Sequence, residues 1–318
     1  MRIWLTLLAF GASTALIAAC GGSQPNSMLP LSGPDILHSG RLSPNAISRN
    51  DLFVGVHLDV SGDTNEVEIL QNGTFKEIGT VGPPGHPEPT ASWVDSHGLY
   101  IGRYYYYGTS DYSSVIEYSS PTKVAFAYSK DISRPSAVTT DSQGNVYEAD
   151  NNGWVNEYAQ KKNVVKARCS LPGGPSTSTP YGVAVDNVGD VFVAYYNGSV
   201  GQIEEFSDLG TCFGFGLGVK LSHPGGMALD THGNILVCEP YKNRVDIIKP
   251  PYDSISSHLG SGLKLPFDIT INGSDNRVWV VDPTEIYDLY YPSGKVRAKI
   301  QGTNVTLLTA VDGSNYVP

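Results

Sequence analysis

The sequence predicts an all-β fold, a six-bladed β-propeller with four-stranded blades, of which the first is closed by the C-terminal strand. One observation is a segment of Pro, five residues and then Asp or Asn, which recurs five times at intervals of 42 to 46 residues. A second is that each interval holds short apolar segments separated by turn residues, the pattern of a four-stranded blade. The third is composition: Gly (35) and Tyr (19) are plentiful and only 16% of residues are charged.

The first residues have the form of an export signal. Arg2 precedes an apolar stretch from Ile3 to Ile17, and small residues then lead to Cys20. This end resembles a bacterial lipobox, which implies that Cys20 is diacylated and becomes the mature N-terminus. An ordinary secretory signal cleaved near a cysteine is the alternative. We therefore expect residues 1–19 to be a signal peptide and the chain to be exported to the bacterial cell envelope, lipid-anchored at a membrane surface.

The next segment has the composition of a linker. Residues 20–50 are rich in Gly, Ser, Pro and Asn and poor in aromatic side chains. Such a segment cannot bury enough apolar surface to fold alone. We expect a flexible tether from the lipidated Cys20 to a propeller that spans residues 51–318.

The repeated segments supply the first strand of each blade. The copies are PTASWVD (Pro89–Asp95), PSAVTTD (Pro135–Asp141), PYGVAVD (Pro180–Asp186), PGGMALD (Pro224–Asp230) and PFDITIN (Pro266–Asn272). The closing carboxylate can accept the backbone N–H two residues further on, and a following Gly tolerates the positive φ of a tight hairpin. The repeated Asp residues are therefore predicted to brace turns rather than to catalyse or to bind a metal.

The two ends of the predicted domain complement each other. Residues 51–57, DLFVGVH, match the second strand of a blade, but no repeated segment precedes them. Residues from Thr306 to Asp312 carry the missing Asp-terminated pattern. We expect this C-terminal strand to complete the N-terminal blade, which leaves no open seam between the first and last blades.

The fourth of these five copies, which begins the fifth predicted blade, carries a family resemblance. Its residues, PGGMALDTHGNILVCEPYKNRVDIIKP, are similar to an NHL repeat, with an Asp-x-x-Gly-Asn turn, a strand that ends in an acidic residue and Asn-Arg before the third strand. The two preceding copies fit but lack the Asn-Arg, and the first and last of the five copies depart further. The resemblance implies an NHL-like propeller architecture over residues 51–318 and does not imply a function.

Three cysteines follow Cys20, namely Cys169, Cys212 and Cys238. An odd number leaves at least one thiol free. Cys169 and Cys212 fall at similar places in consecutive repeats and pairing is open, but neighbouring outer strands need not come within the distance of a disulfide. Three buried or free thiols are the favoured prediction.

The candidate binding residues are those at the ends of the second strands. Alignment of the copies places six side chains at equivalent positions around one mouth of the channel: His57, Arg103, Asp150, Tyr195, Glu239 and Asp282. One hypothesis is that the acids, with His57, hold a cation such as Ca²⁺ or a polar ligand. The alternative, which we favour, is that each acid caps the turn after its own strand. No cofactor is otherwise expected.

Two other features stand out. Glu148 occupies a position at which other copies have an aliphatic residue, so it needs a partner or a raised pKa, unless the blade is locally exposed there. The run Tyr104 to Tyr107, with Tyr112 close behind, is predicted to lie in a long inter-strand loop. It offers either a contact surface for a protein or sugar, or packing of the loop onto its own blade.

Charge and motifs limit the function. A net charge of −10 argues against nucleic acid as a partner, since phosphate neutralisation needs Lys and Arg. The sequence contains no motif for a catalytic nucleophile, zinc protease or phosphate loop, so the chain is more a binder than an enzyme. The leading hypothesis is a binding or scaffold module for a protein, peptide or carbohydrate ligand on the loop face. A metal-dependent lactonase, resembling the gluconolactonase family, or a lyase is the alternative, and a structural envelope component is a third.

Overall fold

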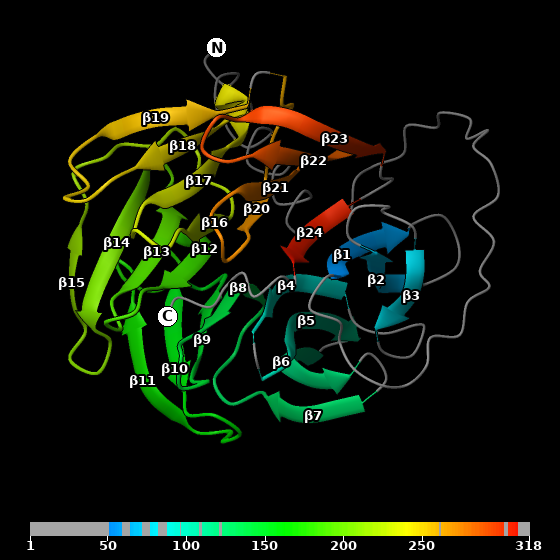
Figure 1. Ribbon diagram of the computed structural model, residues 1–318. Coiled ribbons are helices and arrows are strands. Elements are labelled where there is room, and N and C mark those ends of the chain that lie inside the picture. Colours follow the sequence, from blue (N-terminus) through cyan, green and yellow to red (C-terminus); the bar gives the residue numbers. More distant parts are fainter. Residues whose placement is uncertain are drawn as a thin grey trace, which may run out of the picture.

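The computed structural model describes residues 51–58, 64–71, 77–81, 88–95, 97–107, 110–120, 123–260, 262–301 and 305–310. The predicted signal peptide, Cys20 and the tether lie outside these residues. The described chain is an all-β propeller with four-stranded antiparallel blades (Figure 1). Its described helical segment is the 3-10 helix η1 (Pro240–Lys242). None of the helical structure in this part of the chain is long and apolar enough to cross a membrane.

Most blades use four strands that follow one another in the chain. These blades are β4 (Glu88–Val94), β5 (Leu99–Tyr107), β6 (Ser110–Ser120) and β7 (Lys123–Tyr128); β8 (Pro135–Thr140), β9 (Val146–Asp150), β10 (Trp154–Tyr158) and β11 (Val165–Ser170); β12 (Thr179–Val185), β13 (Val191–Tyr196), β14 (Gly201–Asp208) and β15 (Phe213–Gly216); β16 (Met227–Leu229), β17 (Ile235–Glu239), β18 (Arg244–Ile248) and β19 (Ile255–Leu259); and β20 (Asp268–Ile271), β21 (Arg277–Val281), β22 (Glu285–Tyr290) and β23 (Lys295–Gln301).

One sheet joins the two ends of the described chain. Its strand order is β24 (Val305–Ala310), β1 (Asp51–Leu58), β2 (Thr64–Gln71) and β3 (Glu77–Val81). Strand β24 pairs antiparallel with β1, with Leu52 opposite Ala310. It also lies beside β4 and β20, the innermost strands of two other blades. The predicted pairing of residues 306–310 with the N-terminal strand is therefore present.

The predicted turns are also present. In the hairpin after β8, Asp141 Oδ1 accepts the backbone N–H groups of Gln143 and Asn145, both at 2.9 Å. Gly144 in this turn has φ +77°, a conformation that residues with a Cβ rarely adopt. The prediction that the repeated Asp residues brace hairpins is confirmed here, and Asp186 and Asp230 make the corresponding bonds in the next two copies.

The core lies between blades. Alternate side chains of each strand point to opposite faces of a sheet, so every blade can contact two neighbours. Val155 of β10 packs in one cluster with Val183 and Val193 of the next blade. Leu52 of β1 packs with Trp279 of β21 in another cluster. Burial of each large aliphatic side chain contributes about 1.5–3 kcal/mol, so the blades stabilise one another.

The arrangement defines a common face for the site. Figure 1 shows the innermost strands gathered near the centre, with the outer strands at the rim. The second strands, β5, β9, β13, β17 and β21, each pair antiparallel with the innermost strand of their blade. Their C-terminal ends therefore lie on one side of the propeller, which we call the second-strand face.

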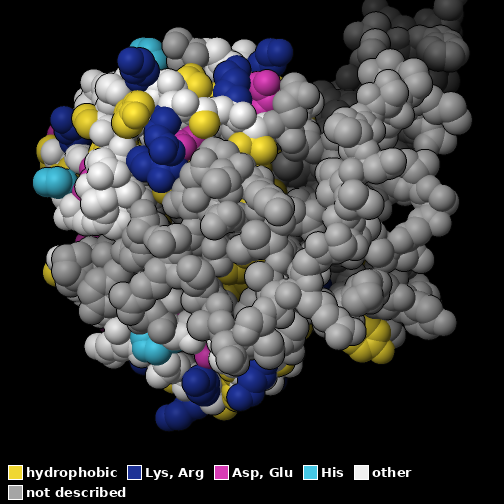
Figure 2. Space-filling model, turned by 45° about the vertical axis from the view of Figure 1, so that its right-hand side comes forward, with side chains coloured by type: hydrophobic (Ala, Val, Ile, Leu, Met, Phe, Trp, Pro, Cys, Tyr) yellow, Lys and Arg dark blue, Asp and Glu magenta, His cyan; other side chains and the backbone are white. Residues whose placement is uncertain are grey.

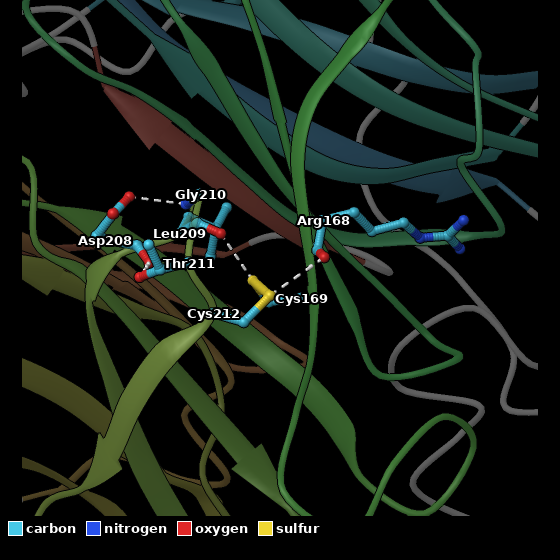
Figure 3. Close-up of a disulfide and its surroundings, with 7 residues drawn as sticks. All are labelled: Arg168, Cys169, Asp208, Leu209, Gly210, Thr211 and Cys212. Carbon is cyan, nitrogen blue, oxygen red and sulfur yellow. Dashed lines mark hydrogen bonds between the residues drawn. A yellow bond between two sulfur atoms is a disulfide. The ribbon is translucent and has the colours of Figure 1, made fainter.

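The cysteine prediction is wrong. Cys169 of β11 and Cys212 form a disulfide, with 5.3 Å between their Cα atoms (Figure 3). The turn between β14 and β15 carries Cys212 back toward the outer strand of the preceding blade, a contact that spacing along the chain does not reveal. Cys238 is buried and free, which agrees with the expectation of at least one unpaired thiol.

The predicted tyrosine loop is also wrong. Residues 104–107 belong to β5, which continues to Tyr107 and pairs with β6, where Tyr105 lies opposite Tyr112. Tyrosine has a high β-propensity, which favours a strand over a loop at these positions. Tyr112 is 62% exposed.

Candidate functional site

The predicted ring residues stand near the ends of the second strands. Asp150 and Glu239 are the last residues of β9 and β17, Tyr195 is next to last in β13, and Asp282 follows β21. Arg103 lies inside β5, because that strand is longer than expected. His57 lies in β1, and its side chain is outside the described residues. The five described side chains are all buried.

The aspartates of this ring bind their own turns. Asp150 Oδ1 accepts the backbone N–H groups of Asn152 and Trp154 at 2.9 and 3.1 Å. Asp282 Oδ1 accepts those of Thr284 and Glu285 at 2.8 and 2.7 Å. These contacts are the turn caps that the alternative interpretation described.

The second carboxylate oxygen of each aspartate has a different environment. Oδ2 of Asp150 and Oδ2 of Asp282 are buried and have no hydrogen-bond partner in the described part of the chain. Burial raises the pKa of Asp150 to about 6, although hydrogen bonds from the Trp154 and Asn152 N–H groups stabilise the ionised carboxylate and lower the pKa. The two residues belong to different blades, one built from β8–β11 and the other from β20–β23. A cation on these side chains stays a prediction.

Glu148 behaves as a buried acid. Its side chain is fully buried, and Asn156 Nδ2, directly across the sheet, donates to Glu148 Oε2 at 2.8 Å. Burial, and then the charge of Asp150, raise the pKa of Glu148 well above its usual value. The prediction of a partner or a raised pKa is confirmed, and the alternative of local exposure is wrong.

Asp230, His232 and Asp275 place three potential metal-ligand atoms within 4.8 Å of one another. They lie in hairpin turns at the end of the blades opposite the second-strand face. Asp230 Oδ2 accepts bonds from Asn234 Nδ2 at 2.6 Å and from the Tyr291 hydroxyl at 2.8 Å. Asp275 Oδ2 accepts the Thr231 N–H at 2.9 Å. Hydrogen bonds within and between the two hairpins account for this group.

A cluster of aromatic rings on the second-strand face was not predicted. His223, in the loop that leads to β16, contacts three tyrosine rings. Its ring centroid is 4.4 Å from that of Tyr196, 5.1 Å from that of Tyr181 and 5.4 Å from that of Tyr241. The rings of His223 and Tyr241 are stacked, with an interplanar angle of 18°. We call these four residues the His223 cluster.

The His223 cluster combines a buried polar group with an exposed aromatic face. His223 is 7% exposed, whereas Tyr241 is 53% exposed. His223 Nδ1 is buried and has no hydrogen-bond partner within the described residues. Burial lowers the pKa of His223, so the imidazole is neutral at pH 7. Burial and the neighbouring Tyr196 raise the pKa of Tyr241, so its hydroxyl keeps its proton.

Glu239 connects the predicted ring to this cluster. Its two carboxylate oxygens accept the backbone N–H of Ser222 at 2.9 and 3.1 Å, and Lys242 Nζ lies 2.8 Å from Glu239 Oε2. Ser222 directly precedes His223. Glu239 therefore holds the loop that carries the imidazole, and its role in ligand binding stays a prediction.

The sequence contained a weak signal for the cluster. Tyr196 follows the ring residue Tyr195, and Tyr241 comes two residues after Glu239. Tyr196 is half-buried and Tyr241 is exposed, whereas Tyr195 and Glu239 beside them are buried. His223 and Tyr181 come from other parts of the chain, and only the packing of two neighbouring blades brings them together.

Charges on the described surface are mixed. Figure 2 shows Lys and Arg side chains at separate places, with acidic side chains beside some of them. Several are paired in the structure: Arg277 Nη2 lies 2.6 Å from Asp288 Oδ2, and Arg297 Nη1 lies 2.7 Å from the same oxygen. Such pairs partly cancel the local field.

No protein-family model matches the chain, and no curated protein sequence is similar to it. Solved structures share its fold. A chain in the crystal structure of a nidogen/laminin complex is 14% identical, with a TM-score of 0.62, over 83% of this chain and 99% of that one. A protein of unknown function from Bacteroides caccae is 12% identical, with a TM-score of 0.59, over 82% and 98%. Virginiamycin B lyase from Staphylococcus aureus is 19% identical, with a TM-score of 0.50, over 67% and 69%. At these identities the similarity shows the fold alone.

Proposed function

We propose that the chain is an exported binding or scaffold module that takes its ligand on the second-strand face, at the His223 cluster. The observation that carries this proposal is the exposed Tyr241 ring stacked on a buried imidazole whose Nδ1 has no partner in the described structure. Aromatic side chains combined with a few polar groups are typical linings of ligand sites, and an exposed tyrosine ring offers a stiff amphipathic contact.

The carboxylates support binding rather than metal-dependent catalysis. A lactonase-like centre needs several oxygen ligands that converge on one cation. Asp150 and Asp282 instead use one oxygen each to cap their own turns, and Glu239 is bonded to Ser222 and Lys242.

The architecture proposed for this module is a ring of six blades closed by β24. Its support is that β24 pairs with β1 and lies beside β4 and β20. A ring without an open edge suits a rigid display surface.

The proposed location is the bacterial cell envelope, with the propeller tethered through a diacylated Cys20. The Cys169–Cys212 disulfide supports export, because structural disulfides persist in oxidising compartments and are rare in the cytosol. Labelling with a radioactive fatty acid tests the anchor: Cys20→Ser should abolish incorporation, and equal labelling of both proteins would rule the anchor out.

Binding is tested with glycan and peptide arrays probed by the purified full chain. The proposal predicts hits that Tyr241→Ala abolishes and that Tyr290→Ala, which changes an exposed tyrosine at the other end of the blades, retains. Hits that are equally strong with Tyr241→Ala would exclude the His223 cluster as the binding site. Hydrolysis of a lactone panel that chelators abolish would instead show that the chain is an enzyme.

A further inference from the structure

We infer that the His223 cluster binds a neutral saccharide, with the Tyr241 ring as its stacking face. This inference rests on the proposed binding function and names the class of ligand. It is carried by the charge, the polarity and the exposure of the cluster.

The cluster carries no uncompensated charge. Burial lowers the pKa of His223, which leaves the imidazole neutral at pH 7. Glu239 and Lys242, which flank Tyr241 along the chain, are paired with each other at 2.8 Å. Lys220, three residues before His223, is exposed to solvent. A charged ligand on the Tyr241 ring would have to give up hydration at a surface that itself carries no charge. The cluster therefore selects a neutral ligand.

Its polarity excludes a purely apolar ligand. The exposed Tyr241 presents a hydroxyl beside its aromatic face. An apolar group that covered this hydroxyl would leave it desolvated and without a bond, which costs about 1–3 kcal/mol. A sugar ring has an apolar face of C–H groups and a rim of hydroxyls, so it matches both parts of an amphipathic tyrosine.

A quaternary ammonium ion is a poorer match, although tyrosine cages attract such ions. Here the space between the tyrosines is occupied by the His223 ring, which contacts all three of them. The accessible surface is the outer face of Tyr241, a flat platform rather than an empty cage. Tyr241 loses little side-chain entropy when a ligand stacks on it, because only two torsions must be fixed.

The test is isothermal titration calorimetry of the full chain with three probes at millimolar concentration. The first is a series of neutral oligosaccharides built from glucose, galactose, mannose or N-acetylglucosamine. The second is a polyuronate oligosaccharide, and the third is a peptide rich in tyrosine and proline. The variants are Tyr241→Ala, Tyr241→Phe and the matched control Tyr290→Ala. Tyr241 is largely exposed, so its substitution leaves the fold intact. Proton NMR of the His223 ring gives a second readout at the cluster itself.

We expect saturable binding of at least one neutral saccharide, with a shift of the His223 signals. Tyr241→Ala should raise the Kd about tenfold or more, Tyr241→Phe should retain most of the affinity, and Tyr290→Ala should change nothing. Binding of none of the neutral saccharides, or binding that Tyr241→Ala does not weaken, overturns the inference. Peptide binding that depends on Tyr241 overturns the saccharide class while the proposed function stands. If no probe depends on Tyr241, the inference and the proposed site both fail.

Discussion

Cys169 of β11 is bonded to Cys212 in the turn between β14 and β15, so the outer strand of one blade is linked to the outer hairpin of the next (Figure 3). Adjacent blades also contact each other through apolar side chains and through hydrogen bonds such as that from Trp93 Nε1 to Thr140 Oγ1. The disulfide adds a covalent constraint between the outer strands.

The first prediction concerns this link. Replacing both cysteines, Cys169→Ser with Cys212→Ser, should lower the free energy of unfolding by about 4 kcal/mol, because the bond closes a loop with a sequence separation of 43 residues. Urea unfolding measures the loss. A reductant should destabilise the wild type and leave the double variant unchanged. Titration of the oxidised wild type that finds Cys169 and Cys212 as free thiols would contradict the bond.

The second prediction concerns Glu239. Glu239→Ala removes the acceptor of the Ser222 N–H and the partner of Lys242. We expect a loss of about 2–3 kcal/mol in unfolding free energy, and weaker ligand binding although Tyr241 is unchanged. Asp253→Ala, at an exposed position, should cost less than about 0.5 kcal/mol. If Glu239→Ala is as mild as this control, Glu239 does not hold the His223 loop.

The third prediction concerns pH. Burial raises the pKa of Glu204 from 4.5 to about 6, so the folded state binds this proton more tightly than the unfolded state. The contribution of this group to the free energy of unfolding therefore falls as the pH rises from its pKa in the unfolded state to its pKa in the folded state. Glu204→Gln should stabilise the protein by about 2 kcal/mol at about pH 8 and by almost nothing at about pH 4.

Glu285 provides a control of opposite sign. Hydrogen bonds from the Tyr287 hydroxyl and then Lys299 lower the pKa of Glu285, so this group stabilises the folded state above its unfolded pKa. Glu285→Gln should bring no gain at about pH 8. Thermal melts across this pH range compare the two variants, and equal pH profiles would show that burial of Glu204 has no energetic consequence.

The fourth prediction concerns the C-terminal strand. Deletion of residues 305–318 removes β24 and exposes the edge of β1, to which it is paired. Since β24 also lies beside β4 and β20, the effect should reach other blades. We expect a loss of several kcal/mol, comparable with a typical total stability of about 5–15 kcal/mol, or aggregation through the open edge.

Deletion of residues 311–318 alone is the matched control, because it leaves β24 in place. Urea unfolding should place the shorter deletion near the full chain and the longer one at much lower denaturant. A deletion of 305–318 that unfolds like the control would show that the two ends do not share a blade.

Local patterns determined the fold class. The Asp-terminated segments predicted innermost strands and their turns, because a carboxylate that accepts N–H groups two and four residues ahead acts within one hairpin. The C-terminal partner of residues 51–57 could also be inferred. These residues resemble the second strand of a blade that lacks its first strand, and residues 306–312 carry the first-strand pattern. Glu148 was recognised as a buried acid by comparison with aliphatic residues in the other copies.

Only the tertiary structure decided the contacts between blades. The Cys169–Cys212 bond depends on how far a hairpin of one blade reaches toward its neighbour, and a repeat alignment carries no such distance. The tyrosines at 104–107 were assigned to a loop because their pairing with the following strand extends beyond the repeat.

The His223 cluster shows the same division. By itself the sequence determined that second strands end on a common face and that residues at those ends are the ones to examine. It could not show that the Glu239 carboxylate accepts a hydrogen bond from the Ser222 N–H, or that Tyr181, Tyr196 and Tyr241 surround the imidazole of His223. Strand pairing is governed by short-range alternation that recurs in the chain, whereas the site depends on side-chain packing between two blades, which no local pattern encodes.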